Sequence, residues 1–532
     1  MGTAASTPAH NTFHLPGSWF HFLLIGGGLF LRLRLARLTF LNPDEALHYF
    51  LAQQPSLKLA YEASLTTAHP PLMIIFLHYW SLLGRSEFFL RLPFVIAGTL
   101  FCWVMFLWTR KVAGGIAACF ALAIFLFSPS LISLSAEIRQ YSLLLLFCAS
   151  CLYWIQCALE NEGQNSIRWI SLSAGSLYLA LLTHYSAMIF AAAAGIYTLL
   201  LLARKKWPRR LTRSWILGQA GAIAICILLY ESQISKLKES GVPSEIATTW
   251  LRSSIFQPGQ SHLATFASSN TLRLFRYFFS HGTIGVIGFA LFVFAVIALI
   301  LPSNSLWPKS QNRALAALVG VPFVITLLVA IAGVYPYGGT RHDVVLAIFA
   351  ISAIAIAWDG LPLGLSVATA KFVKALLLAS AMLICNLYPS PSGPHIKPRN
   401  QRRELMQQAI SSIGSLPPTA VIFTDAQGSM VLNYYLCDEG MDLPYTTQKQ
   451  LLNFHCGDHA VLTSMVAQTG FDRDTFPELL SRVRRENAGQ RLYLFQAGWI
   501  DDKEEDWLTE LRGLGGDPHN FGSNILVCAF RP

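Results

Sequence analysis

The sequence predicts an all-α polytopic membrane domain followed by a small α/β domain. Of its 532 residues, 53% are hydrophobic and only 13% are charged, which is about half the charged share of a typical soluble protein. The mean hydropathy is +0.46. Acidic residues are unevenly spread, with 12 in residues 1–389 and 17 in residues 390–532. We therefore expect a membrane domain over 1–389 and a water-soluble domain over 390–532.

Eleven segments are apolar and long enough to cross a bilayer, for which about 20 residues are needed. They are roughly 18–38, 91–109, 113–131, 141–158, 167–183, 186–203, 213–231, 283–301, 315–333, 343–358 and 371–388. The first run lacks the flanks of a cleavable signal, so we expect it to be retained. The run at 70–83 is shorter, and we expect it to lie along the membrane surface.

The basic residues set the orientation. With eleven spans and a cytoplasmic N-terminus, clusters such as RKKWPRRLTR (204–213) fall in cytoplasmic loops, as the positive-inside rule requires. A spanning 70–83 would move that cluster outside. We therefore expect an inner-membrane protein whose C-terminal domain is periplasmic. The net charge of +10 then reflects these loops and lipid headgroups, and it does not indicate nucleic-acid binding.

The C-terminal domain begins after a Pro/Ser/Gly-rich linker at 388–400. Apolar, β-rich runs at 420–425, 491–499 and 524–530 predict strands, and 427–437 and 475–486 predict helices. Its cysteines are Cys437, Cys456 and Cys528, so at most one internal disulfide forms, and the first two are one pairing. A ligand-binding role and a structural or acceptor-guiding role both remain open for this domain.

Four acidic residues fall near membrane depth on the expected outer face. They are Asp44, Glu45, Glu137 and Asp343, the first two in an outer loop over 39–90. Arginines lie close by in the sequence, at positions 139 and 341. Ionisable groups at such depth are costly unless they pair or line an aqueous cavity. Two interpretations follow: structural ion pairs at helix ends, or a cavity where arginines hold a phosphate and a carboxylate acts as a base.

Four motifs in order give a resemblance to a known family. A first span is followed by PDEA (43–46), HPPL (69–72), RLP (91–93) and EIRQYSLLLLF (137–147). This pattern resembles the integral-membrane glycosyltransferases of the GT-C fold, and most closely the branch of protein O-mannosyltransferases and lipid A aminoarabinose transferases (family 39). The resemblance covers residues 15 to about 205 well and 315–390 loosely.

The resemblance implies an inverting transfer of a sugar from a polyprenyl-phosphate donor to an extracytoplasmic lipid, glycan or protein. Asp44 matches the family's catalytic base, with Glu45 as its neighbour, and Glu137 matches a second acidic position less securely. Arg341 matches a basic residue that contacts the donor phosphate. The positions implied beside these are Arg139, Tyr141 and His342. This chemistry needs a carboxylate that takes the proton of the acceptor hydroxyl. It also needs positive charges, such as arginines, that stabilise the leaving phosphate.

Three further polar residues are candidates for substrate contact, each with an equal or stronger structural alternative. They are His69, which precedes Pro70, and the pair His184 and Tyr185 at an outer turn. The cysteines in the apolar runs, Cys148 and Cys151 among them, are most simply packing residues, and no Cys/His cluster indicates a metal, although a divalent metal remains open. A glycine-rich nucleotide-binding loop is also missing, which fits a lipid-linked donor.

Two other classes of protein compete with a glycosyltransferase. A transporter or flippase for lipid-linked sugars is expected to show internal repeats with helices broken at mid-membrane. The sequence shows no such repeat, and its outer-face acids do not lie at mid-span. A membrane scaffold is the third alternative, and in a scaffold Asp44 would be replaceable.

Overall fold

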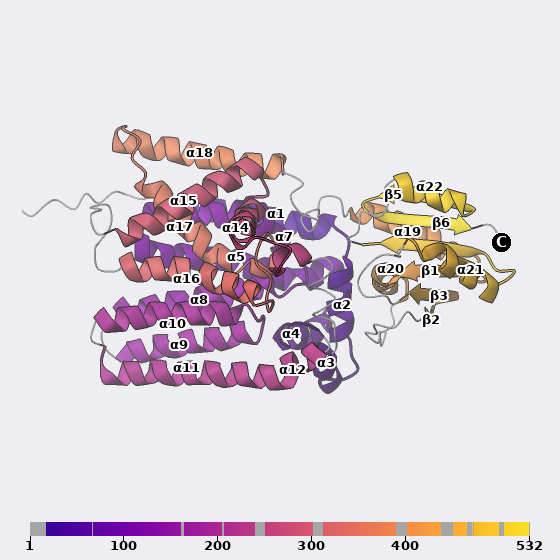
Figure 1. Ribbon diagram of the computed structural model, residues 1–532, viewed down its shortest axis with the longest axis horizontal. Helices are drawn as coiled ribbons and strands as arrows, with labels where there is room; N and C mark the ends of the chain where they lie inside the picture. Colours follow the sequence, from indigo (N-terminus) through magenta and orange to yellow (C-terminus); the bar gives the residue numbers. More distant parts are fainter. Residues whose placement is uncertain are drawn as a thin grey trace, which may run out of the picture.

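The fold is described from a computed structural model. It describes residues 18–65, 67–160, 164–204, 207–239, 251–301, 312–389, 402–437, 451–464, 471, 473–498 and 505–530. Figure 1 shows a bundle of long helices and, at one end of it, a smaller domain built around a sheet. The helical bundle and the small α/β domain of the predicted fold class are therefore present. The division at residues 389 and 390 stays a prediction, because the linker at 388–400 lies almost wholly outside the described residues.

The long helices of the first domain coincide with the eleven expected spans. They are α1 (Ser18–Leu38), α5 (Glu87–Ala113), α6 (Gly115–Phe127) with α7 (Pro129–Ser135), α8 (Tyr141–Glu160), α9 (Gln164–Leu181), α10 (Ala187–Arg204), α11 (Arg209–Leu229), α15 (Gly282–Ile300), α16 (Asn312–Ile331), α17 (Leu346–Gly360) and α18 (Val367–Leu387). Among the described residues, seven helices are long and apolar enough to cross a membrane, or eight with the bent pair α6–α7. The multi-pass character is confirmed, and the count of eleven stays a prediction.

Shorter elements connect the spans. They are α2 (Pro43–Ala52), α3 (Leu57–Ser64), α4 (Leu72–Ser81), η1 (Tyr230–Ile234), α12 (Ser235–Glu239), η2 (Arg252–Ser254), α14 (Leu263–Phe279) and η3 (Arg341–Asp343). Helix α4 corresponds to the predicted surface segment. Its 10 residues extend about 15 Å, which is too short for a hydrocarbon core of about 30 Å.

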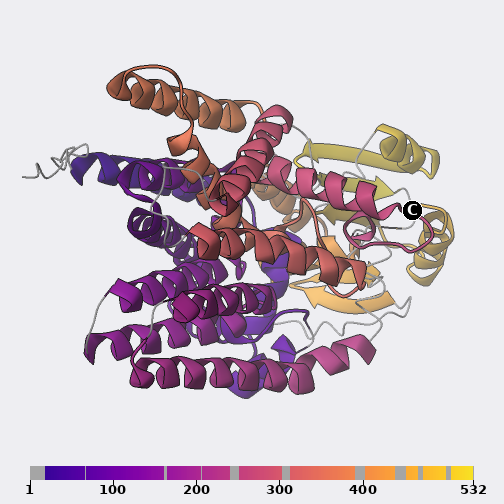
Figure 2. The same cartoon turned by 60° about the vertical axis from the view of Figure 1, so that its left-hand side comes forward.

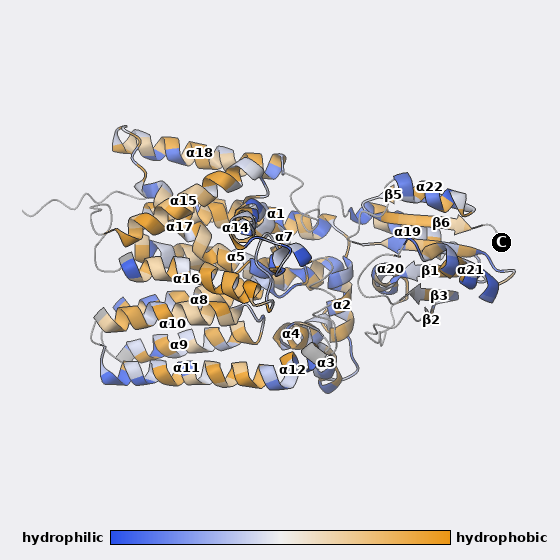
Figure 3. Ribbon diagram, in the orientation of Figure 1, coloured by the Kyte–Doolittle hydropathy of each residue, from blue (hydrophilic) through white to orange (hydrophobic). Residues whose placement is uncertain are grey.

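Burial separates the centre of the bundle from its lipid-facing periphery. Every residue of α17 from Leu346 to Ala357 is buried. Helix α18, in contrast, is largely exposed, and its exposed residues include Leu376, Leu377 and Leu383. Figures 1 and 2 both place α18 at the outer edge of the bundle, and Figure 3 shows its apolar colouring. An exposed apolar surface of this kind is expected of a helix in contact with lipid.

A buried arginine stabilises the bend between α6 and α7. The two helices meet at 59°, which leaves the last carbonyls of α6 without helical partners. Arg32 of α1 is fully buried and donates to the carbonyls of Leu126 (2.8 Å) and Phe125 (3.2 Å). The amide of Asn386 donates to the carbonyl of Phe127 (2.8 Å). These bonds satisfy the last three carbonyls of α6, and α7 leads directly into the turn that carries Glu137.

The C-terminal domain is a six-stranded sheet between two layers of helices. The strand order is β2-β3-β1-β4-β6-β5, with β1 parallel to both β3 and β4 and the other pairs antiparallel. Its elements are α19 (Arg403–Gly414), β1 (Val421–Asp425), α20 (Ala426–Leu432), η5 (Asn433–Cys437), β2 (Leu451–Cys456), β3 (His459–Ser464), α21 (Phe476–Glu486), β4 (Leu492–Ala497), α22 (Glu505–Gly513), β5 (Gly516–Gly522) and β6 (Ile525–Phe530). Helices α21 and α22 pack on one face of the sheet, and α19 and α20 pack on the other.

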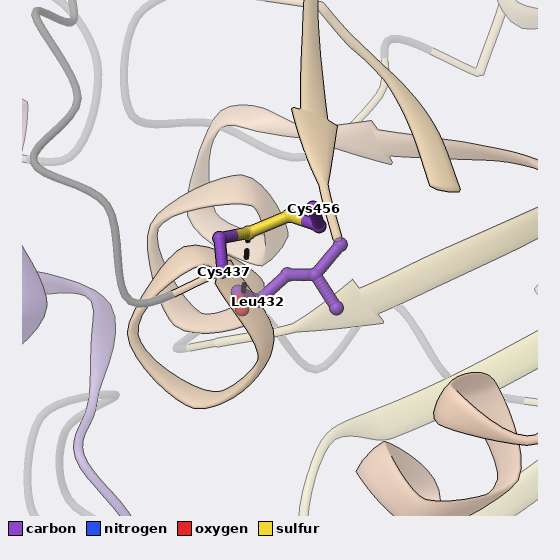
Figure 4. The surroundings of a disulfide bond; sticks show 3 residues. All are labelled: Leu432, Cys437 and Cys456. Carbon is purple, nitrogen blue, oxygen red and sulfur yellow. Dashed lines mark hydrogen bonds between the residues drawn. A yellow bond between two sulfur atoms is a disulfide. The ribbon is translucent and has the colours of Figure 1, made fainter. Parts of the chain in front are cut away.

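The predicted α/β domain is confirmed, and the structure adds a hairpin to it. Strands β1, β4 and β6 lie in the three predicted strand runs, and α20 and α21 lie in the predicted helical runs. The sequence did not predict α19, α22 or β5, nor the strands β2 and β3, which pair around Gly457 at a φ of 57°. Cys437 and Cys456, one of the pairings that the sequence allowed, are joined by a disulfide (Figure 4). Cys528 is buried and reduced.

Candidate active site

Asp44 lies in the first turn of α2, where local sequence fixes its position. Asn42 is the N-cap and Pro43 follows it within the first turn. The Asn42 side chain accepts from the backbone N–H of Glu45 (3.0 Å), and the Glu45 carboxylate accepts from the backbone N–H of Asn42 (3.1 Å). This capping box stabilises the first turn. The helix-cap role and a chemical role for Asp44 are therefore compatible, because the cap orients the carboxylate.

Two arginines from distant segments converge on the Asp44 carboxylate. Nη2 of Arg341 lies 2.7 Å from Oδ2 of Asp44, and Nη1 of Arg139 lies 3.4 Å from Oδ1. The Asp44 side chain is 14% exposed, while both arginines are buried. Burial opposes ionisation of Asp44, but the positive charges of Arg139 and Arg341 prevail and hold its pKa below the usual range. The sequence predicted only that Asp44, Arg139 and Arg341 lie on the same outer face of the membrane, and it did not predict their contact.

Glu45 forms a buried ion pair with Arg91 of α5. Arg91 donates from Nε to Oε1 (2.7 Å) and from Nη2 to Oε2 (2.5 Å), and both side chains are almost completely buried. The backbone N–H of Ile138 also donates to Oε1 (2.8 Å). Both oxygens of Glu45 are thus occupied by protein donors. In this geometry Glu45 holds α2, α5 and the Glu137–Arg139 turn together, and it offers no free oxygen to a substrate.

Arg91 also binds the end of the first span. Its remaining N–H groups donate to the backbone carbonyls of Ala36 (2.9 Å), Thr39 (2.8 Å) and Phe40 (2.7 Å). All five guanidinium donors are therefore used. Arg91 lies in the RLP motif on which the resemblance partly depends, but its role was not identified from the sequence. A partner 46 residues away cannot be read from local spacing.

Glu137 has a different environment from Asp44. It is 7% exposed, and the hydroxyl of Ser133 donates to its Oε1 at a long 3.5 Å. Burial and the negative charge of Glu45 raise the pKa of Glu137 to about 7, against the opposing effect of Arg341 and Arg139. A carboxyl that titrates near neutrality can gain and lose a proton at physiological pH.

The loop that carries Arg341 is fixed by Asp343. The carboxylate of Asp343 is fully buried and accepts from the backbone N–H of Gly338 (2.9 Å) and from the hydroxyl of Thr340 (3.4 Å). Gly338 has a φ of 145°, and a side chain at Gly339 would approach the carbonyl of Arg273 at 2.6 Å. The two glycines therefore let the loop pack closely on α14. Asp343 acts here as a hydrogen-bond acceptor, and burial raises its pKa well above the usual range.

A row of neighbouring histidine rings borders Asp44. The ring centroids of His48 and His69 are 5.9 Å apart, those of His69 and His184 are 5.4 Å apart, and those of His184 and His342 are 6.5 Å apart. Tyr141 adds a contact to His184 (5.4 Å). Burial and the charge of Arg139 lower the pKa of the first three histidines, so these rings are neutral at pH 7.

Local contacts fix the tautomers of two of these rings. Nδ1 of His48 lies 2.5 Å from the backbone carbonyl of Asp44, which can only accept, so Nδ1 carries the proton. In His184 the backbone N–H of Ser186 donates to Nδ1 (3.1 Å), so the proton is on Nε2. Within the described part of the chain, no hydrogen-bond partner is found for Nε2 of His48 or Oη of Tyr185. His48 was not identified from the sequence, although its i+4 spacing from Asp44 places both on one helix face.

The surroundings of Asp44 fit an anion better than a metal ion. The described ranges contain no group of three or more His, Cys, Asp or Glu side chains that could hold a metal. The Asp44 oxygens face guanidinium groups, and Arg139 is close to the histidine rings. A phosphate at this point would meet Arg139 and Arg341 as hydrogen-bond donors. The predicted residues Arg139, Tyr141, Arg341, His342, His69 and His184 thus lie around Asp44, and Tyr185 adjoins His184.

Comparisons with known proteins agree with this architecture. Residues 68–230 match the family model described as dolichyl-phosphate-mannose-protein mannosyltransferase. The fold is similar to the crystal structure of ArnT from Cupriavidus metallidurans bound to undecaprenyl phosphate, with a TM-score of 0.55, 14% identity and coverage of 97% of this chain and 100% of that chain. The apo state of the same protein gives a TM-score of 0.53, with 14% identity and coverage of 97% and 99%.

A more distant structure has the same fold. The archaeal oligosaccharyltransferase AglB from Archaeoglobus fulgidus, in complex with an inhibitory peptide and a dolichol-phosphate, gives a TM-score of 0.50 with 11% identity, covering 90% of this chain and 69% of that chain. No protein of curated function matches the sequence. The predicted fold class, a GT-C-type helical membrane domain with a small α/β domain, is confirmed. Within that class, the chain is similar to family 39.

Proposed function

We propose that the chain is an inverting glycosyltransferase that moves a sugar from a polyprenyl-phosphate donor to an acceptor hydroxyl outside the cytoplasm. The observation that carries the proposal is the contact of Asp44 with both Arg139 and Arg341 in a GT-C fold. A carboxylate beside two buried guanidinium groups provides a base and an anion-binding site within one small volume. The polyprenyl phosphates bound in ArnT and AglB support a donor of this chemical class.

The transfer can be written with every bond and charge accounted for. Asp44 takes the proton of the acceptor hydroxyl while the acceptor oxygen forms a bond to the anomeric carbon. The bond from that carbon to the phosphate oxygen breaks, and its electron pair leaves with the phosphate. Attack from the opposite face inverts the anomeric centre. The carboxylate loses one negative charge as the phosphate gains one, so the charge that Arg139 and Arg341 balance stays constant.

The other residues around Asp44 divide into proton-handling and binding roles. Glu137 is assigned as a second catalytic carboxyl, because its pKa of about 7 suits reversible proton transfer. Tyr141 supports Arg139 through a cation–π contact of 5.5 Å and a hydrogen bond from Nη2 (3.4 Å). His69, His184, His342 and Tyr185 are assigned to substrate contact. Glu45 is assigned as the residue that positions Asp44.

The substitution Asp44→Asn tests the base directly. Loss of general-base catalysis costs about 10²–10⁴-fold in rate, so transfer from undecaprenyl-phosphate-linked mannose or aminoarabinose should fall by that factor. Binding of undecaprenyl phosphate should persist, because the arginines lose a competing carboxylate. The matched control is Asp506→Asn on the exposed surface of α22, which should leave transfer unchanged. Full transfer by the Asp44→Asn variant would refute the assignment.

We also propose that the N-terminus is cytoplasmic and that the C-terminal domain lies outside the cytoplasm, in an inner membrane. The Cys437–Cys456 disulfide supports this orientation, since such bonds persist in oxidising compartments. The C-terminal domain also lies at the same end of the bundle as α2 (Figure 1). A cysteine placed at the exposed Ser415 should react with a membrane-impermeant reagent in intact cells. Labelling only after membrane disruption would reverse the orientation.

A further inference from the structure

The C-terminal domain contacts the segment that carries Asp44 through a buried surface. Helix α20 packs against α2, and Met430 of α20 lies in a buried cluster with Leu47 and Phe50 of α2. A bridge between Thr39 and Arg402 joins the two domains at the end of α1. These contacts fix the relative position of the two domains.

Polar contacts reinforce this surface at both sides of the Asp44 turn. The backbone N–H of Leu41, which is fully buried, donates to the hydroxyl of Tyr435 (2.8 Å). Leu41 directly precedes the N-cap of α2. Nε of Arg403 pairs with the buried carboxylate of Glu87 (2.6 Å) at the start of α5. Glu87 is one helical turn before Arg91, the residue that binds Glu45.

A second tyrosine extends the contact. The hydroxyl of Tyr434 donates to the carbonyl of Arg85 (2.8 Å), and its ring lies edge-on to that of Tyr49 with centroids 5.2 Å apart. Tyr434 and Tyr435 therefore bind two different parts of the 39–90 loop. Both lie in η5, which follows α20, so one short segment of the C-terminal domain makes the contacts before α2 and before α5.

The carboxyl end of β1 leads into α20, the helix that contacts α2. In open α/β sheets, ligands bind beyond the carboxyl ends of the parallel strands, which here are β1, β3 and β4. At that edge Asp425 accepts from the N–H of Gly428 (2.7 Å) and from the amide of Gln496 (3.0 Å), and Trp507 donates to Gln496 (2.9 Å). Every residue of α20, the helix that begins at this edge, is buried.

We infer that the C-terminal domain is a fixed part of the active site, with Tyr435 and Arg403 as positioning residues for Asp44. The inference rests on the proposed function, because it assigns the role of the domain in the transfer reaction. It excludes a freely moving acceptor-binding module. Tyr435 acts through the start of α2, and Arg403 acts through Glu87 and the start of α5.

The experiment compares Tyr435→Phe with Tyr493→Phe in the full-length chain in detergent. Tyr435→Phe leaves the buried N–H of Leu41 without an acceptor, whereas Tyr493 is a half-buried residue on β4 of the same domain. Amide hydrogen exchange over residues 41–52 should become at least tenfold faster in the first variant and stay unchanged in the second. The kcat for transfer should fall about tenfold in Tyr435→Phe, with binding of undecaprenyl phosphate within twofold of the wild type.

Arg403 provides an independent variant should Tyr435→Phe fail to fold. Arg403→Gln removes the charge beside Glu87, and Arg403→Lys retains it, so the lysine variant should recover most of the transfer lost with glutamine. Unchanged exchange over 41–52, or unchanged kcat, in both Tyr435→Phe and Arg403→Gln would overturn the inference.

The exchange measurement also separates this inference from the proposed function. A wild-type chain that transfers no sugar from any polyprenyl-phosphate donor would refute the proposed function. The exchange rate over 41–52 would still decide whether Tyr435 fixes the start of α2.

Discussion

The substitution Glu45→Gln should destabilise the fold strongly, because it leaves a buried charge without its partner. The ion pair with Arg91 is formed by side chains that are 0% and 1% exposed, so solvent screens it little. Glutamine can replace one accepting oxygen, but its amide group would face the donors of Arg91, Asn42 or Ile138. Removing one partner of such a pair costs about 3–5 kcal/mol.

The measurement is the free energy of unfolding of the purified protein in a detergent that permits refolding. The helix content of the protein serves as the signal for unfolding. Glu404→Gln is the matched control, since Glu404 pairs with Arg402 at the surface and both are largely exposed. Exposed pairs contribute about 0–1 kcal/mol. In a double-mutant cycle with Arg91→Met, the coupling energy should be about 2 kcal/mol. A Glu45→Gln protein of wild-type stability that cannot transfer sugar would refute this reasoning and would make Glu45 a catalytic group.

Three further predictions follow from the site. The pKa of Glu137 is raised from 4.5 to about 7, so the folded state binds more protons than the unfolded state. Stability should therefore fall by up to about 3 kcal/mol as the pH rises from 4.5 to 7. Glu137→Gln should remove this pH dependence of stability in thermal unfolding at several pH values, and an unchanged pH dependence would contradict the prediction. Arg341→Ala should weaken undecaprenyl phosphate binding at least tenfold in a titration, with Arg402→Ala as an exposed control, and equal affinity in both variants would contradict the phosphate role. Because Asp343 accepts hydrogen bonds while buried, Asp343→Asn should retain phosphate binding and Asp343→Ala should lose about 1–3 kcal/mol of stability; equal losses in the two variants would indicate that the charge matters.

The membrane helices were predicted well because one property, the length of an apolar run, decides where they form. A run of about 20 apolar residues has few alternatives in lipid, and the expected spans coincide with helices. The bend after Phe127 could not be predicted, since it depends on Arg32 and Asn386 from distant helices. In the C-terminal domain, the hairpin around Gly457 was not recognised because its strands, LLNFHC and HAVLTS, mix apolar and polar residues.

The sequence named both the residues around Asp44 and their roles, and the catalytic roles stay predictions. Topology placed Asp44, Glu137 and Arg341 on one face, and the motifs assigned Asp44 as the base with Glu45 beside it. The division between Asp44, which faces two arginines, and Glu45, which is enclosed by protein donors, depends on distances that no spacing specifies. Arg91 and His48 were not identified as members of the site, because a buried arginine and a helical histidine have many structural explanations.

The pairing of Asp44 with Arg139 and Arg341 also has a consequence for timing. With no other anion present, these guanidinium groups hold the carboxylate in its charged form and make it a weak base. A phosphate bound to the same two guanidinium groups would neutralise part of their positive charge. The affinity of the Asp44 carboxylate for a proton would then rise again. The resting protein would then be unreactive toward water or stray hydroxyl groups. Its base would become effective only once the donor had arrived.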